Sequence, residues 1–179
     1  MKPDIQWYHA GMAIRFRALA PLSALAIVLL TPSIASADIT AFIGVNGTPS
    51  TRPVKGLAVG AGLLIVGFEF EYANTNEDLT NPSEFAPALR TYMFNGLVQT
   101  PFAIAGFQPY ATAGGGVYHE TLSVFNVSET NVGVNIGGGV KMNLAGPLRL
   151  RFDYRVLTLK GHALHPTVQR FYAGVNLKF

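Results

Sequence analysis

Residues 169–179 alternate between apolar side chains and polar or small ones. Phe171, Ala173, Val175, Leu177 and Phe179 fall on one side of an extended chain, and Arg170, Tyr172, Gly174, Asn176 and Lys178 fall on the other. A period of two is typical of a β-strand with one apolar face and one polar face. The same alternation recurs in short segments from residue 39 onward, so the pattern predicts an all-β protein.

Seven further segments have the same strand character. They cover residues 39–46, two strands within 54–73, and then 88–98, 109–120, 131–144 and 148–156. Polar or Gly- and Pro-containing segments separate them, at 47–53, 74–85, 100–108, 145–147 and 161–166. The strand at 109–120 is rich in glycine, so its inward and outward faces are not distinguished by the pattern.

The segment 54–73 changes phase midway. Its apolar residues are first Leu57, Val59, Ala61 and Leu63, and then Val66, Phe68, Phe70 and Tyr72. A change of phase in an unchanged environment requires a turn or a bulge, and we place a tight turn near residues 63–65. This division gives eight strands, in line with the even strand numbers of bacterial membrane barrels.

Seven charged residues of the strands share the polar face. They are Glu69, Glu71, Lys141, Arg149, Arg151, Asp153 and Arg155. A soluble lipocalin-like barrel would turn this face to water, whereas a membrane barrel would turn it to the lumen. One arginine facing lipid at the bilayer midplane costs about 2–4 kcal/mol, so exposing the three of the strand at 148–156 would rival the whole stability of a domain, about 5–15 kcal/mol. The pattern therefore predicts a membrane barrel.

Composition agrees with this prediction. Of the 179 residues, 49% are hydrophobic and 13% are charged, whereas about a quarter are charged in ordinary soluble proteins. No run of about 20 apolar residues indicates a spanning helix. The chain contains no cysteine, and its formal charge of +3 includes no basic cluster of the kind that nucleic-acid binding requires.

The first 37 residues have the pattern of a secretory signal peptide. Arg15 and Arg17 precede an apolar run at 18–30, and the small residues Ala35 and Ala37 follow as an A-x-A cleavage site. We predict cleavage after Ala37 and a mature barrel domain at 38–179. Met12 is a possible true start of translation. The alternative, a membrane anchor helix, is disfavoured because the run is short and contains a proline.

The last strand resembles the C-terminal signal strand of bacterial outer-membrane barrels. Tyr172, Gly174, Leu177 and Phe179 match its pattern of a polar or aromatic residue, Gly, an apolar residue and a terminal aromatic. The whole segment 38–179 resembles the small eight-stranded OmpA/OmpX-type barrels. This resemblance implies an eight-stranded antiparallel up-and-down transmembrane β-barrel in the bacterial outer membrane. It also implies insertion by the barrel assembly machinery, contact with outer-membrane lipid and lipopolysaccharide, and a monomer.

The seven charged residues predict an ion-pair network in a narrow, polar lumen, because buried charges must be paired. Glu69 and Glu71 could instead form a carboxylate pair for acid–base catalysis. We expect the network, and with it a closed structural or interaction protein without catalysis. A small-solute channel or a carrier of hydrophobic compounds is the alternative.

A lipid A-modifying enzyme is a further alternative. His119, Glu120 and Ser123 are its candidate residues, but adjacent residues on a strand face opposite ways. His162 and His165 lack a neighbouring carboxylate, so we expect neither a metal nor another cofactor. Arg52, Arg90 and Lys160 fall near the predicted outer strand ends, where they could meet lipopolysaccharide phosphates.

Overall fold

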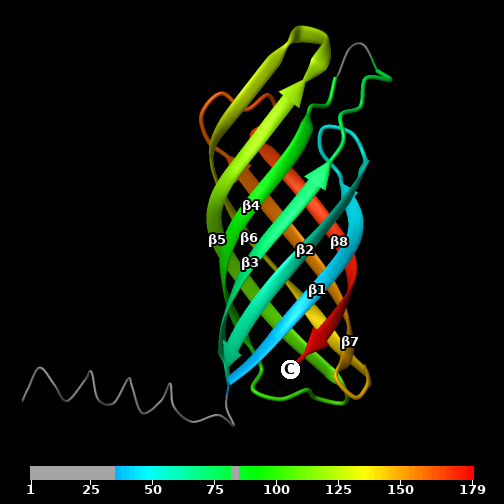
Figure 1. Cartoon of the computed structure of the whole chain (residues 1–179), viewed down its shortest axis with the longest axis vertical. Helices are drawn as coiled ribbons and strands as arrows, with labels where there is room; N and C mark the ends of the chain where they lie inside the picture. The colour runs from blue at the N-terminus through cyan, green and yellow to red at the C-terminus, as the bar shows by residue number, and fades with distance from the viewer. Residues whose placement is uncertain (1–34, 82–84) are drawn as a thin grey trace, which may run out of the picture. The chain divides into compact units, whose positions relative to one another are not determined.

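The computed structural model describes residues 35–81 and 85–179, and these residues form eight long antiparallel strands (Figure 1). The strands are β1 (Ala35–Asn46), β2 (Arg52–Leu63), β3 (Val66–Thr75), β4 (Ala88–Gln99), β5 (Phe107–Leu122), β6 (Val127–Ala145), β7 (Leu148–Leu159) and β8 (Thr167–Lys178). A single 3₁₀ turn, η1 (Ser123–Phe125), joins β5 to β6. The predicted signal segment up to residue 34, with Met12, lies outside the described residues.

The strands pair in sequence order and close into a barrel. Closure is made by β1 and β8, whose register runs from Asp38 opposite Lys178 to Asn46 opposite Arg170. A closed barrel satisfies its backbone hydrogen bonds internally and leaves no open edge, which is what a bilayer requires. The predicted fold is confirmed. Among the described residues, no helix has the length and apolar character needed to cross a membrane.

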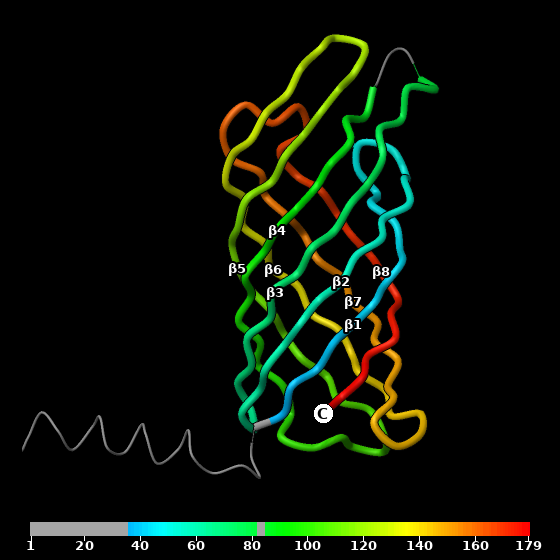
Figure 2. Tube along the Cα trace, viewed as in Figure 1, coloured from blue at the N-terminus to red at the C-terminus, as the bar shows by residue number. Residues whose placement is uncertain are grey.

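The connections differ between the two ends of the barrel. Figure 2 shows the C-terminus, the start of β1 and the β2–β3 and β6–β7 turns at one end. The β2–β3 turn consists of Leu64, with φ +53°, and Ile65, so the predicted turn near residues 63–65 is confirmed. The third connection at this end, at residues 100–106, is longer than these two turns. The connections at 47–51, 76–87, 123–126 and 160–166 join strands at the opposite end and are longer on average, so we call it the outer end, because outer-membrane barrels have their longer loops outside.

Burial alternates regularly along most of the strands, less so in β5 and β6, and identifies the lumen face. In β3, Glu69 and Glu71 are buried while Phe68 and Phe70 are exposed. The face of β5 that the sequence left open is now clear, because Gln108, Tyr110, Thr112 and Tyr118 point inward. Outward apolar side chains such as Ile43 and Ile136 are 72% and 66% exposed to the surroundings. The apolar face is therefore the outer wall.

A glycine makes room for a large inward side chain of β8, Tyr172. Tyr172 lies directly opposite Gly44 in the β1–β8 register. A Cβ atom at Gly44 would lie 2.6 Å from the Cβ of Tyr172, so a side chain cannot be accommodated there without a shift. The Tyr172 ring instead stacks on Phe42, with 4.0 Å between ring centroids. This pair fixes the β1–β8 seam from the inside.

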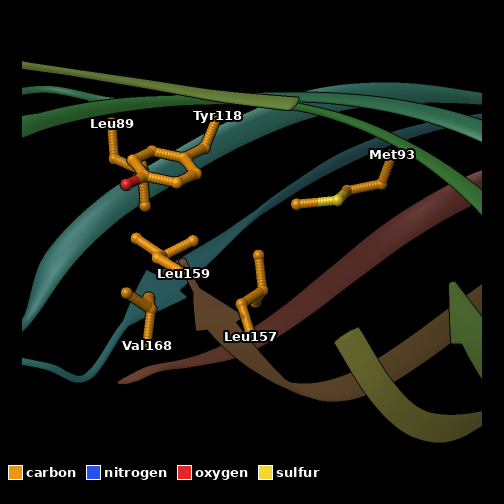
Figure 3. Close-up of a cluster of buried hydrophobic side chains, with 6 residues drawn as sticks. All are labelled: Leu89, Met93, Tyr118, Leu157, Leu159 and Val168. Atoms are coloured by element: carbon orange, nitrogen blue, oxygen red, sulfur yellow. The ribbon is translucent and has the colours of Figure 1, made fainter. Parts of the chain in front are cut away.

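An apolar cluster lies in the outer part of the lumen, which also holds the buried charged residues Arg52 and Glu120. Figure 3 shows six buried side chains from four strands that point toward one another, namely Leu89, Met93, Tyr118, Leu157, Leu159 and Val168. The prediction of a polar lumen did not include this apolar cluster. The physical reason is that β7 continues beyond Val156, and Leu157 and Leu159 keep the inward parity of the arginines before them.

Candidate functional site

Nine charged lumen residues form two groups of ion pairs, which hydrogen bonds through Asn176 and Thr40 join into one network. The structure brings together all seven residues of the predicted network and adds Asp38 and Arg170. Eight ion pairs link four carboxylates with five cations: Asp38, Glu69, Glu71, Asp153, Lys141, Arg149, Arg151, Arg155 and Arg170. Most of these side chains are almost completely buried.

The centre of the network consists of two arginines and two carboxylates. Arg151 forms a two-pronged contact with Glu69, and its Nη2 also lies 3.0 Å from Asp153. Arg155 lies 2.8 Å from Glu69 and 2.8 Å from Asp153. Bidentate and shared contacts of this kind are the strongest ion pairs in proteins. Each charge in the centre therefore has at least two partners of opposite sign.

Glu71 joins the centre to the outer side of the lumen. It lies 3.1 Å from Arg170 and 3.1 Å from Arg155, and it accepts a 3.2 Å hydrogen bond from the Tyr172 hydroxyl. Arg170 also donates to Thr91 and Asn46. These bonds tie β8 to β1, β3 and β4 across the lumen. The apolar cluster of Figure 3 starts at this layer, since its member Met93 lies opposite Glu71 in the β3–β4 register.

Asp38 forms the inner end of the network. Its Oδ2 lies 2.7 Å from Lys141 and 3.4 Å from Arg149. Arg149 also donates to Asn176 at 2.9 Å and to Gln108 at 3.1 Å. A cavity beside Asp38 and Lys141 measures about 10 Å³, which is the space of one water molecule at most.

Tyrosines complete the network. The Tyr110 hydroxyl donates to Asp153 and accepts from Arg151 Nε at 2.7 Å, and the Arg151 guanidinium lies 4.9 Å from the Tyr110 ring centroid. The sequence prediction omitted Asp38, Tyr110 and Arg170 from the network. Arg170 shares the parity of Tyr172 and Gly174 on β8, and this signal could have identified it. The glycines of β5 concealed the parity of Tyr110.

The carboxylates of Glu69 and Glu71 are not arranged for acid–base catalysis. Glu69 and Glu71 do face the same way, but each is bound by two arginines within the lumen. Both are almost fully buried between ion pairs and leave no room for a substrate beside them. The arrangement is suited to holding strands together.

The candidate enzyme residues are not brought together. His119 points outward from β5 and contacts the Thr130 hydroxyl at 2.7 Å, whereas Glu120 is buried and accepts from the Leu164 backbone N–H at 3.1 Å. Ser123 binds Glu77, with 2.7 Å between Ser123 Oγ and Glu77 Oε1. A nucleophile with an oriented histidine base is therefore not assembled from these residues.

The two loop histidines have separate surroundings. His165 Nε2 lies 3.3 Å from the Phe85 carbonyl oxygen, and the backbone N–H of His162 donates to Glu129 at 3.3 Å. Within residues 35–81 and 85–179, no group of three or more histidine and acidic side chains is arranged to hold a metal ion.

Arg52, one of the three cations considered for contact with lipopolysaccharide phosphates, does not face the lipid. Arg52 is 3% exposed and faces the lumen, where its guanidinium donates to the carbonyl oxygens of Thr48, Asn76 and Pro87. The prediction that it meets lipopolysaccharide phosphates is wrong, because Arg52 shares the inward parity of Val54 on β2. Arg90 and Lys160 are exposed.

The residues of the C-terminal motif divide between the two faces of β8. Tyr172 and Gly174 are buried in the lumen, while Leu177 and Phe179 face outward. The Phe179 backbone N–H donates to the Ala37 carbonyl oxygen at 2.8 Å. Strand β1 begins at Ala35, so the predicted cleavage after Ala37 lies within the strand.

Comparison with known families identifies this architecture. Residues 28–179 match the outer membrane protein beta-barrel domain. The chain belongs to this family. No curated protein sequence matches the chain. The family and its structural relatives place the protein in the bacterial outer membrane, as predicted.

Solved structures with the same fold are distant in sequence. The N-terminal β-barrel domain of Pseudomonas aeruginosa OprF is 18% identical with a TM-score of 0.61, covering 80% of this chain and 97% of that domain. Neisserial surface protein A is 16% identical with a TM-score of 0.59, covering 81% and 97%. The outer membrane enzyme PagL is 16% identical with a TM-score of 0.50, covering 78% and 98%. At these identities the likeness extends to the fold alone.

Proposed function

We propose that this protein is a structural and interaction protein of the outer membrane, with a lumen closed to solutes and with outer loops as its contact surface. The observation that carries the proposal is the filling of the lumen. Five cations and four carboxylates form ion pairs in its inner and central parts, and six apolar side chains pack together further out, where Arg52 and Glu120 are also buried. Eight-stranded barrels have interiors just wide enough for side chains.

The interaction half of the proposal rests on the β5–β6 hairpin. These are the two longest strands, and their hairpin extends beyond the neighbouring strands at the outer end (Figure 1). Val124 and Phe125 at its tip are 54% and 61% exposed. Exposed apolar side chains at a projecting tip favour contact with another surface.

The proposal predicts little ion conduction. The purified, refolded protein should give no large, steady single-channel current in planar bilayers, because the ion pairs and the apolar cluster leave no water-filled path. A large-pored porin in the same bilayers serves as the positive control. Large steady currents from the unmodified chain would contradict the proposal and favour the small-solute channel. A carrier of hydrophobic compounds would need an apolar lumen throughout, whereas the inner half is charged.

The enzyme alternative has its own test, since an enzyme such as PagL shares the fold. Expression of the protein in a Gram-negative host should leave the mass profile of lipid A unchanged. A new deacylated or otherwise modified species that disappears in Ser123→Ala or His119→Ala would overturn the proposal that this protein has no catalytic activity.

A further inference from the structure

A groove runs across the outer wall of the barrel. Its volume is about 790 Å³, and it crosses strands β8, β1, β2 and β3. Outward side chains of these strands line it, among them Ala41, Ile43, Leu57, Tyr72 and Ala173. The lining is mostly apolar and faces the surroundings of the barrel, which in the membrane are acyl chains. The groove therefore suits a hydrocarbon chain along its length.

Polar residues close one end of the groove. Lys55, Asn74 and Arg90 line it there, and they lie side by side on β2, β3 and β4 because Lys55 pairs with Asn74 and Asn74 with Arg90. Adjacent strands are about 4.8 Å apart, so the Cα atoms of the two cations are roughly 10 Å apart. Arg90 Nε donates to Asn74 Oδ1 at 3.3 Å. The long basic side chains of Lys55 and Arg90 thus stand on either side of Asn74.

Among the residues that the structure describes, no carboxylate neutralises these cations. Within residues 35–81 and 85–179, neither Lys55 nor Arg90 forms an ion pair with a carboxylate. Both are exposed, in contrast to the buried arginines of the lumen. Lys178, an exposed cation of β8, lies at the opposite end of the barrel. An anionic group from outside the chain is the partner that this arrangement fits.

The height of the cations matches a lipid headgroup. Tyr72 and Tyr92 form a tilted ring pair on the outer wall, with 5.1 Å between centroids. Tyrosines at this position are typical of the membrane interface. Asn74 and Arg90 each lie two residues nearer the outer end than these tyrosines, which is about 7 Å along a strand. The polar end of the groove therefore lies at the level of phosphates and the apolar part at the level of acyl chains.

We propose that this groove binds a phosphorylated lipid of the outer leaflet. Lys55 and Arg90 bind its phosphate, and one of its acyl chains lies along the groove past Leu57 and Ala173. The proposal extends the proposed interaction function to the lipid around the barrel. The lipid site does not depend on a closed lumen. A measured conductance would therefore contradict the proposed function without contradicting lipid binding, and a lack of lipid binding would leave the closed lumen untouched.

Native mass spectrometry of the detergent-solubilised full chain tests the site, with bis-phosphorylated lipid A as the probe. The double variant Lys55→Gln/Arg90→Gln should bind this lipid at least about tenfold more weakly, because each basic residue near a lipid surface contributes about 1 kcal/mol. The matched control, Lys178→Gln, removes an exposed cation of β8 at the opposite end of the barrel and should bind as the wild type does. Equal losses in both variants would overturn the site.

The groove itself is tested by filling it. Ala173→Phe should lower lipid A binding, whereas Ala111→Phe, an outward position of β5 outside the groove, should not. Both face lipid, so heat-modifiable gel mobility should show both variants folded. Equal binding by the two variants would overturn the acyl-chain path. Equal binding of lipid A and its fully dephosphorylated form to the wild type would overturn recognition of the phosphate.

Discussion

At the scale of single residues, the odd or even position of a residue along its strand decides whether its charge faces the lumen. The ion-pair partners across the lumen then decide how much free energy the burial of that charge costs. Arg151 is fully buried and contacts Glu69, Asp153 and Tyr110. Taking such a group out of water is costly unless every donor is matched. Removing one member of the network therefore leaves its partners as unpaired buried charges.

Arg151→Met tests this dependence. We expect the free energy of unfolding in detergent or lipid, measured by urea titration, to fall by about 3–5 kcal/mol, because Glu69 and Asp153 lose a shared partner. The exposed Lys160→Met should change it by less than about 0.5 kcal/mol. The double variant Glu69→Gln/Arg151→Met should lose less than the sum of the two single variants. Additive losses would show that the two residues are not coupled.

The sequence identified most of the network because the arginines and carboxylates alternate with apolar residues. It did not identify the partners. Asp38 precedes the first predicted strand, and Tyr110 lies in the glycine-rich β5, whose faces look alike in sequence. Which residues meet across a lumen depends on the tilt and stagger of all eight strands, and strand periodicity carries no information on that stagger.

At the scale of elements, the outer loops are joined by short-range polar contacts. The segment after β3 binds η1 through Glu77, which accepts from the Ser123 backbone N–H at 3.0 Å and from the Ser123 hydroxyl at 2.7 Å. Asp78 accepts from the Thr80 hydroxyl at 2.6 Å and from Ser50 at 3.0 Å. These bonds connect the loops around the β5–β6 hairpin, although their residues are exposed.

The contact between Glu77 and Ser123 should depend on pH. Hydrogen bonds from the Ser123 backbone N–H and hydroxyl lower the pKa of Glu77 below its ordinary value. Because the folded pKa is lowered, this contact stabilises the loop above the ordinary pKa of glutamate and is lost as pH falls through the lowered pKa. Ser123→Ala should raise the pKa of Glu77 part of the way back, since the backbone donor remains. NMR titration of the carboxyl carbon measures this shift.

Asp78 supplies the control for this titration. The Thr80 hydroxyl is the main cause of its lowered pKa, followed by the Thr80 backbone N–H. Thr80→Ala should therefore raise the pKa of Asp78 and leave that of Glu77 unchanged. A pKa of Glu77 that responds equally to both substitutions would contradict the contacts described.

At the scale of the whole molecule, alternating faces were sufficient to predict the closed eight-stranded barrel, because the strand at 148–156 has one stable orientation in a membrane. The turn at Leu64 and Ile65 followed from the phase change between Leu63 and Val66. The apolar cluster in the outer part of the lumen was missed, because Leu157 and Leu159 resemble lipid-facing residues unless β7 is known to extend through them. Strand length, rather than strand pattern, was the missing information.

The central claim is that the apolar face of the barrel meets hydrocarbon while the arginines of β7 face an enclosed interior. The chain contains no cysteine, so single spin labels can be placed by Phe94→Cys, Ile136→Cys and Phe125→Cys without background. In lipid bilayers, labels at 94 and 136 should be accessible to oxygen and protected from a water-soluble relaxant, whereas the label at 125 on the outer hairpin should be open to the relaxant. Labels at 94 and 136 that are as open to the aqueous relaxant as the label at 125 would contradict the account.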